Sequence, residues 1–217
     1  MSTHLENDLE NVKLKMFEMA DMAIDAIRMS VESLKKSDVA TAEQVIQNDT
    51  YLDKMEIMID DACIKLLVTR QPAAGDLRLV LAVLKINTDL ERIGDLATNI
   101  AKETIRCDGR TPLKPLVDIP RMGGICIEML KDALQAISTR DVARAQRVIE
   151  TDTEIDYLNM QIYRELFSYM AENPHTITQA MGLIMVSKAL ERIGDHATNI
   201  AERAIYYIQG EDVRHQL

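Results

Sequence analysis

The chain is poor in the residues that interrupt helices or mark other fold classes. Its 217 residues include no Trp, two Phe, eight Gly and five Pro. The longest apolar run, residues 79–84, is far below the ~20 residues that a membrane-spanning helix needs. The N-terminus lacks the basic and apolar regions of a signal peptide. We therefore expect neither a membrane span nor a secreted protein.

Cysteine is scarce too, which argues against a disulfide framework. Cys63, Cys107 and Cys126 are an odd number, and they are scattered without a C-x-x-C pair. This usage fits small core side chains in a reducing compartment. The predicted location is the cytoplasm.

Positive charge is in deficit, with a formal net charge of −10 at pH 7. Nucleic acids are bound by Lys and Arg that neutralise phosphates, so this balance argues against a nucleic-acid partner. It argues equally against direct adsorption to an anionic membrane surface. If the protein acts at a membrane, another protein should bring it there.

The chain contains a twelve-residue segment that occurs twice. Residues 90–101 return as residues 190–201, and only Leu96 and His196 differ between the copies. Upstream, residues 38–50 align with residues 141–153 at an offset of 103 instead of 100, about one helical turn of difference. The chain is therefore a tandem duplication, which largely determines its architecture.

Both copies have the periodicity of helices. Apolar residues recur at steps of three and four in residues 17–34, 52–66, 86–104 and 127–137. Helix breakers lie between these stretches: Pro72 and Gly75; Gly109, Pro112, Pro115 and Pro120; and Pro174. The pattern predicts an all-α fold of six helices in two tandem, pseudo-symmetric three-helix bundles. The bundles should span residues 1–108 and 118–217, with a linker near residues 109–117.

Acidic pairs at i, i+4 occur at four places in register with the repeat. Such spacing places two carboxylates on one side of a helix, about 100° from the apolar seam where neighbouring helices meet. Like charges so arranged are unfavourable, so a cation should complete them. The candidate metal ligands are Asp49, Asp53, Glu91, Asp95 and Asn99 in the first half, and Asp152, Asp156, Glu191, Asp195 and Asn199 in the second. These all-oxygen sets favour hard cations such as Mg, Mn, Ca or iron.

Two other interpretations of the acids remain open at this point. They could form a solvated helical surface on a plain scaffold, neutralised in part by Arg92 and Arg192. They could also belong to a carboxylate-bridged metal hydrolase or oxidase. The enzyme would need an open coordination position and a substrate pocket, and such sites usually contain His ligands. The sequence contains no G-x-S-x-G, no H-E-x-x-H, no Gly-rich phosphate loop and no visible nucleophile, so we expect no enzyme.

The chain resembles the PhoU family, accessory regulators of bacterial phosphate-specific ABC transport. The resemblance rests on D-x-x-x-D at residues 49–53 and 152–156 and on E-R-I-G-D at residues 91–95 and 191–195. The R-Q-P and D-L-R segments at residues 70–72 and 76–78 contribute to it. It implies metal clusters on the paired acidic motifs, with iron, zinc, manganese or magnesium. The one departure, Leu96 in place of His196, implies that the two sites differ if His joins a cluster.

The resemblance also implies a role. A PhoU-like protein would be a cytoplasmic negative regulator of phosphate uptake and of the phosphate-starvation response, often as a homodimer. It would act as an adaptor between the ATPase subunit of the phosphate ABC transporter and a sensor histidine kinase. It would catalyse no reaction.

Overall fold

In a computed structural model, which describes residues 2–107 and 112–210, every regular element is a helix. The helices are α1 (Ser2–Lys36), α2 (Val39–Arg70), α3 (Ala74–Arg106), α4 (Asp118–Thr139), α5 (Val142–Glu172) and α6 (Ile177–Gln209), with a short 3₁₀ turn, η1 (Pro174–Thr176). The predicted all-α, six-helix fold is confirmed. Part of the predicted linker, residues 108–111, lies outside the described residues, so the proposed bundle boundaries stay a prediction.

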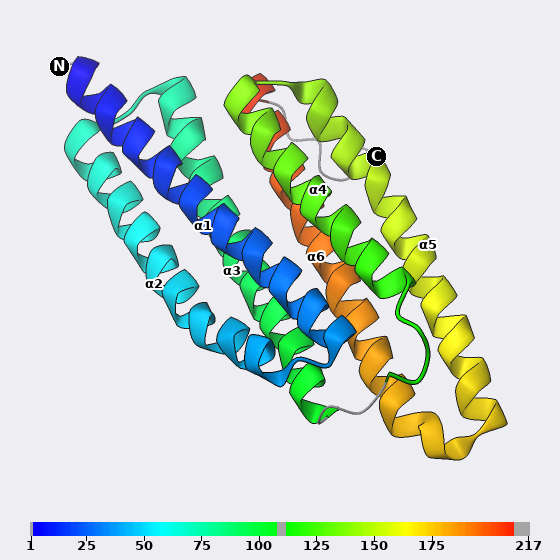
Figure 1. Ribbon diagram of the computed structural model, residues 1–217. Helices are drawn as coiled ribbons and strands as arrows, with labels where there is room; N and C mark the ends of the chain where they lie inside the picture. The colour runs from blue at the N-terminus through cyan, green and yellow to red at the C-terminus, as the bar shows by residue number, and fades with distance from the viewer. Residues whose placement is uncertain (1, 108–111, 211–217) are drawn as a thin grey trace.

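The two repeats fold into two three-helix bundles packed side by side. Helices α1, α2 and α3 contact one another, as do α4, α5 and α6. The bundles meet through α3 with α6 and through α1 with α4, while α2 and α5 form the outer edges (Figure 1). One face of the molecule therefore shows α1 and α4, and the opposite face shows the α2–α3 and α5–α6 seams.

The first turn of each repeat is built in the same way. Ser37 and Arg140 adopt left-handed conformations with φ of 55°. The next residues, Asp38 and Asp141, cap the following helices by accepting hydrogen bonds from the backbone N–H groups of Thr41 and Arg144. An Asp at this position satisfies a helix N–H that has no partner in the helix. Equivalent caps give α2 and α5 the same start, and hence the same register for the acids that follow.

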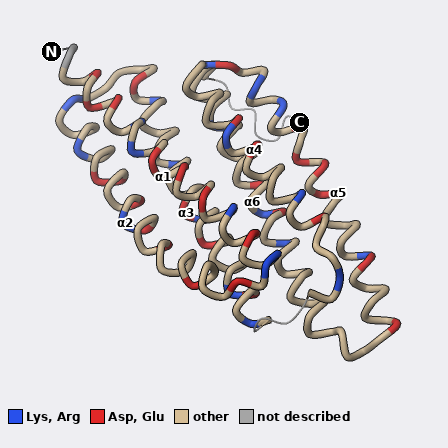
Figure 2. Tube along the Cα trace, viewed as in Figure 1, with Lys and Arg blue, Asp and Glu red and all other residues tan. Residues whose placement is uncertain are grey.

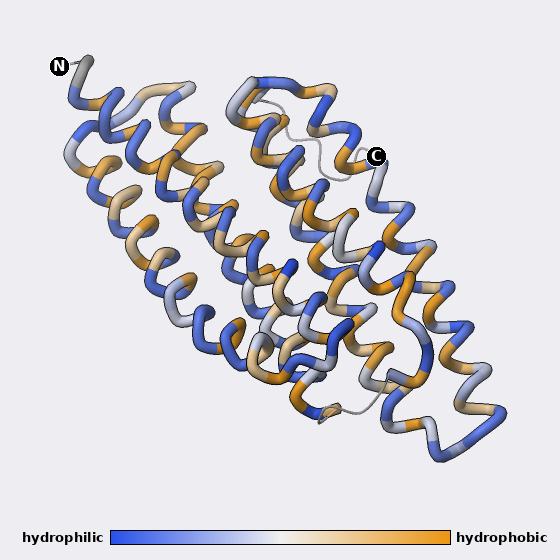
Figure 3. The backbone as a smooth tube through the Cα atoms, viewed as in Figure 1, coloured by the Kyte–Doolittle hydropathy of each residue, from blue (hydrophilic) through white to orange (hydrophobic). Residues whose placement is uncertain are grey.

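Most of the core is one apolar cluster shared by the bundles, with a small second cluster of Ala42, Val45 and Ala101. Hydrophobic and hydrophilic residues alternate along every helix (Figure 3). The buried side chains are mainly Leu, Ile, Ala and Met, including Met16, Met19, Ile86 and Ile193. Burial of such side chains stabilises each bundle by roughly 1.5–3 kcal/mol per large residue. Within the described residues, no helix is sufficiently long and apolar to cross a membrane.

Candidate metal centres

The acids of the first repeat lie along the seam between α2 and α3. Asp49 and Asp53 are one turn apart on α2, and Glu91 and Asp95 are one turn apart on α3. A Cβ added at Gly94 would lie 3.3 Å from Asp49 Oδ1. The glycine therefore lets the carboxylate of α2 approach the backbone of α3, next to Asp95.

The electrostatics of this seam reflect crowded negative charge. Burial, then the charges of Asp53 and Asp95, raise the pKa of Asp49. Burial and Asp95 likewise raise the pKa of Glu91, against the opposing charge of Arg92. Arg92 lies 3.2 Å from a carboxylate oxygen of Glu91 and 3.2 Å from one of Asp95. One exposed arginine therefore neutralises part of a cluster of four acids.

Glu56 is a fifth acid of this cluster, which the predicted ligand set does not contain. Burial, Asp60 and Asp53 raise its pKa, and its own charge contributes to the raised pKa of Glu91. The residue at the equivalent position of the second repeat is Asn159. A search for acids common to both repeats therefore omits Glu56. Its spacing of three residues from Asp53, which places both acids on one side of α2, could have identified it from the sequence.

The second repeat forms the corresponding cluster on α5 and α6. Burial, then Asp195, Asp156 and Glu191, raise the pKa of Asp152 to about 6. The pKa of Asp195 is raised by burial and by Glu191. A Cβ at Gly194 would lie 3.1 Å from Asp152 Oδ1, so the close approach at Gly94 is repeated. Here Lys188, 2.5 Å from Glu191, supplies the nearby positive charge.

Several buried oxygens in these seams have no hydrogen-bond partner. They are Glu191 Oε2 and the hydroxyls of Thr98 and Thr198. Thr98 and Thr198 face Asp49 and Asp152 closely enough to lower the pKa of each acid, although neither reaches hydrogen-bond geometry. A buried oxygen without a partner is costly, and a cation is a natural partner for it. The donor set, all oxygen and rich in carboxylate, fits a hard divalent or trivalent metal.

The two amides of the predicted sets differ in their surroundings. Asn99 is exposed to solvent. Asn199 donates from Nδ2 to Asp89 Oδ1 across the seam between the repeats, at 3.4 Å. His196 Nδ1 lies 2.9 Å from the same Asp89 oxygen. The structure thus joins Asn199 and His196 to an acid of the first repeat that sequence analysis does not single out.

The structure therefore brings the eight predicted acids together in two groups of four, one in each seam. Within residues 2–107 and 112–210, no three acidic, His or Cys side chains lie close enough together to hold a metal ion. The carboxylates of each group are neighbours along two helices and do not surround one point. Acidic residues follow both outer helices in Figure 2, interspersed with Lys and Arg.

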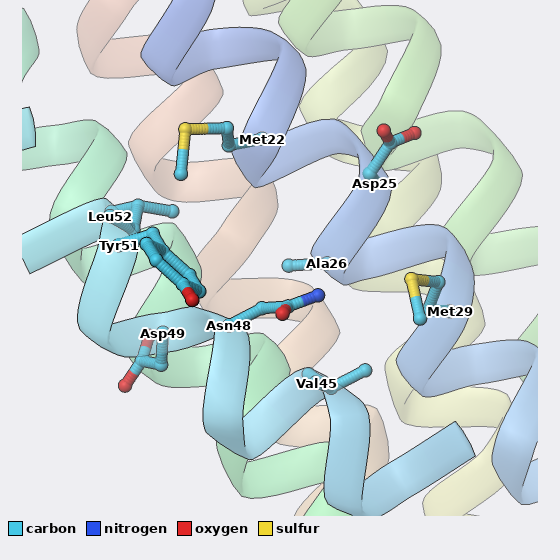
Figure 4. Close-up of a pocket in the computed structure, with 9 residues that line it drawn as sticks. All are labelled: Met22, Asp25, Ala26, Met29, Val45, Asn48, Asp49, Tyr51 and Leu52. Carbon is cyan, nitrogen blue, oxygen red and sulfur yellow. The ribbon is translucent and has the colours of Figure 1, made fainter.

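A mostly apolar pocket lies beside the first cluster, between α1 and α2. It has a volume of about 210 Å³. Figure 4 shows Met22, Ala26 and Met29 of α1 opposite Val45 and Leu52 of α2. The carboxylate of Asp49 points away from Ala26, toward the other side of α2. No Lys or Arg is among the lining residues, so a free phosphate ion would find no cationic partner in it.

Comparison with known families identifies both repeats. The family model described as the PhoU domain matches residues 16–104 and again residues 119–204. The match occurs once in each bundle, and each matched range contains one acidic seam. The two halves of the tandem duplication that the sequence predicts are therefore two copies of one known domain.

Curated relatives match over almost the full chain. A phosphate-specific transport system accessory protein PhoU homolog of Aquifex aeolicus is 42% identical over 212 residues, covering 98% of this chain and 96% of the relative. The phosphate-specific transport system accessory protein PhoU of Escherichia coli is 33% identical, covering 99% and 89%. The crystal structure of PhoU from Pseudomonas aeruginosa superposes with a TM-score of 0.91 at 35% identity, covering 95% of this chain and 99% of that one.

Proposed function

This chain belongs to the PhoU family, and from that premise we propose that it is a metal-binding negative regulator of phosphate uptake and of the phosphate-starvation response. The observation that carries the metal part of the proposal is the duplicated acidic seam. Four acids with overlapping charges recur at equivalent positions of both bundles, beside a glycine that admits the Asp carboxylate. Such repulsion is relieved by a bound cation.

Each seam would hold metal through its own carboxylates. Asp49, Asp53, Glu91 and Asp95 would be the ligands of the first site, and Asp152, Asp156, Glu191 and Asp195 those of the second. Glu56 extends the first set. Asn99 and Asn199 would ligate through their amide oxygens or orient the carboxylates. The metal, which we take to be iron, zinc, manganese or magnesium, would supply positive charge that neutralises each seam.

The regulatory part of the proposal concerns protein partners. The relatives from Aquifex aeolicus and Escherichia coli are described as accessory proteins of a phosphate-specific transport system. We propose that this chain is a cytoplasmic homodimer that connects the ATPase subunit of the phosphate ABC transporter with a sensor histidine kinase. It would reach the membrane only through these proteins and would catalyse no reaction.

A cell-based assay tests this function. In cells that lack their own copy of the regulator, the wild-type chain should repress a starvation-promoter reporter at high phosphate. Asp95→Asn combined with Asp195→Asn should fail to repress, because both seams lose an acid. Asp61→Asn, an exposed acid of α2 outside the seam, should repress like the wild type. Full repression by the double variant would refute the link between the acids and regulation.

Copurification with the two partners tests the adaptor role separately. The wild-type chain should retain the ATPase subunit and the cytoplasmic part of the kinase. Failure to retain either protein would remove the adaptor role and leave the question of metal binding untouched.

A further inference from the structure

The α5–α6 seam has an acidic half and an apolar half on the same open face. Asp156, Asp195 and Glu191 form the acidic half. Beyond them, six large apolar side chains are 44–63% exposed: Met160, Tyr163 and Phe167 on α5, and Ile177, Met181 and Met185 on α6. We call these six residues the apolar lane.

Helix periodicity and cross-helix bonds align the two sides of the lane. Steps of three and four residues keep each set of three side chains on one side of its helix. Ser187 donates to Asn159 Oδ1 at 2.5 Å, and the Thr176 hydroxyl donates to the backbone carbonyl of Tyr169 at 3.1 Å. These two bonds bracket the lane and fix the register of the antiparallel helices.

The exposed area is large for a free surface. Six side chains of this size, about half exposed, present on the order of 600 Å² of surface. That is the upper range for the largest apolar patch of a soluble monomer and close to the ~800 Å² that one partner contributes to a stable interface. Three of the six are Met, whose flexible thioethers adapt to apolar partners.

The first repeat lacks an equivalent lane. The positions that correspond to Tyr163 and Met185 carry Asp60 and Lys85. Asp60 accepts a hydrogen bond from Asn87 Nδ2 at 2.9 Å. Charge therefore interrupts the α2–α3 surface at two of the six positions.

We propose that the α5–α6 face is the docking site for an amphipathic helix of a partner protein with apolar anchors and a basic end. The apolar lane would receive anchors at i, i+4 and i+7, the spacing of helix-in-groove recognition. From Ile177 to Asp195 the face is roughly 27 Å long at 1.5 Å per residue, or about five helical turns. In the metal-free protein, Lys or Arg at one end of the partner would then lie against Asp156 and Asp195, in the place of the metal that these carboxylates would otherwise bind. This inference rests on the proposed accessory role and gives it a surface and a partner chemistry.

Two model peptides provide the probe. Both are labelled helices of about 18 residues with leucines at i, i+4 and i+7 in one half and a charged turn at the other end; the charged turn carries lysines in one peptide and glutamates in the other. Fluorescence anisotropy with metal-free wild-type protein should show binding of the lysine peptide. The glutamate peptide should bind at least about tenfold more weakly, because the acidic half repels it.

The duplication supplies a matched control. Phe167→Ser with Met181→Ser should weaken binding of the lysine peptide by about tenfold or more. Ile64→Ser with Leu81→Ser alters the equivalent positions of the first repeat and should leave binding unchanged. All four side chains are exposed, and melting curves will show that both double variants are folded. The proposal would be overturned if both double variants weaken binding of the lysine peptide equally, or if neither variant weakens it.

Sedimentation of the same proteins tests whether a second copy of the chain occupies the lane. If the wild type is a dimer that Phe167→Ser with Met181→Ser converts to a monomer, a second copy covers the lane and the proposal is wrong. An unchanged oligomeric state agrees with it. The peptide assay uses metal-free protein, so its result does not depend on whether the acidic seams bind metal. Failure of the docking proposal and failure of the metal-binding proposal can therefore be told apart.

Discussion

His196 Nδ1 of the second repeat lies 2.9 Å from Asp89 Oδ1 of the first, across the seam between α3 and α6. Both side chains are mostly buried, at 17% and 13% exposure. The positions related to them by the duplication are Leu96 and Ala189. One polar contact between the repeats therefore has an apolar counterpart, and the two acidic seams lie in unequal surroundings.

This asymmetry predicts a compensating pair of substitutions. Asp89→Ala should lower the free energy of unfolding by about 1–3 kcal/mol, because His196 and Asn199 lose their acceptor in a buried seam. Adding His196→Leu recreates the Ala and Leu of the counterpart contact and should recover most of that loss. Chemical denaturation of the three proteins measures both effects. A double variant no more stable than Asp89→Ala would contradict the account.

Gly94 should resist replacement although it lies within a helix. A Cβ there would come within 2.9 Å of Leu52 Cδ1, and Leu52 is buried. We expect Gly94→Ala to lower the free energy of unfolding by about 1 kcal/mol, as crowding outweighs the better helix propensity of Ala. Gly124→Ala is the control, because no atom lies within 4 Å of the added Cβ; it should stabilise by about 0.5–1 kcal/mol. Similar effects at both positions would argue against close packing at Gly94.

Asp152 should make the stability of the metal-free protein depend on pH. In the unfolded chain it ionises near 3.8, whereas in the folded protein its pKa is about 6. The folded state holds the proton more tightly, so protonated Asp152 stabilises the fold. This stabilisation is complete below pH 4 and is lost as the pH rises to 6. Asp152→Asn should therefore reduce the fall in stability between pH 4 and pH 7. Equal pH dependence in Asp152→Asn and wild type, measured by denaturation in chelator, would refute the raised pKa.

Metal should stabilise the folded chain, since the seams exist only after folding. At a free concentration of about 100 Kd, a bound ion adds roughly 2.7 kcal/mol, or about 5–10 °C in Tm for a chain of this size. A chelator should reverse the gain in wild type and have no effect on Asp95→Asn with Asp195→Asn. An equal response of the two proteins would place the metal elsewhere.

The helices and the duplication could be predicted from the sequence because both depend on local pattern. Apolar steps of three and four residues define the helices, and the Asp38 and Asp141 caps give equivalent starts. The eight acids could be predicted because residues at i, i+4 share one side of a helix wherever that helix packs.

The contacts across the repeats could not be predicted in this way. Asp89 and His196 are 107 residues apart, and the position equivalent to Asp89 is Ala189, so no repeated pattern marks the pair. The environments of Asn99 and Asn199 differ for the same reason, since only Asn199 has Asp89 beside it. Such features depend on how the bundles pack, which a local pattern does not encode.

The central claim is that the two acidic seams bind metal, and metal content per chain tests it most directly. Mass spectrometry should be applied to wild type and to Asp95→Asn with Asp195→Asn, each incubated with Fe, Mn, Mg or Zn and then freed of unbound ions. Stoichiometric metal in the wild type and its loss from the folded double variant is the predicted result. No bound metal in the wild type under any of these conditions would contradict the claim.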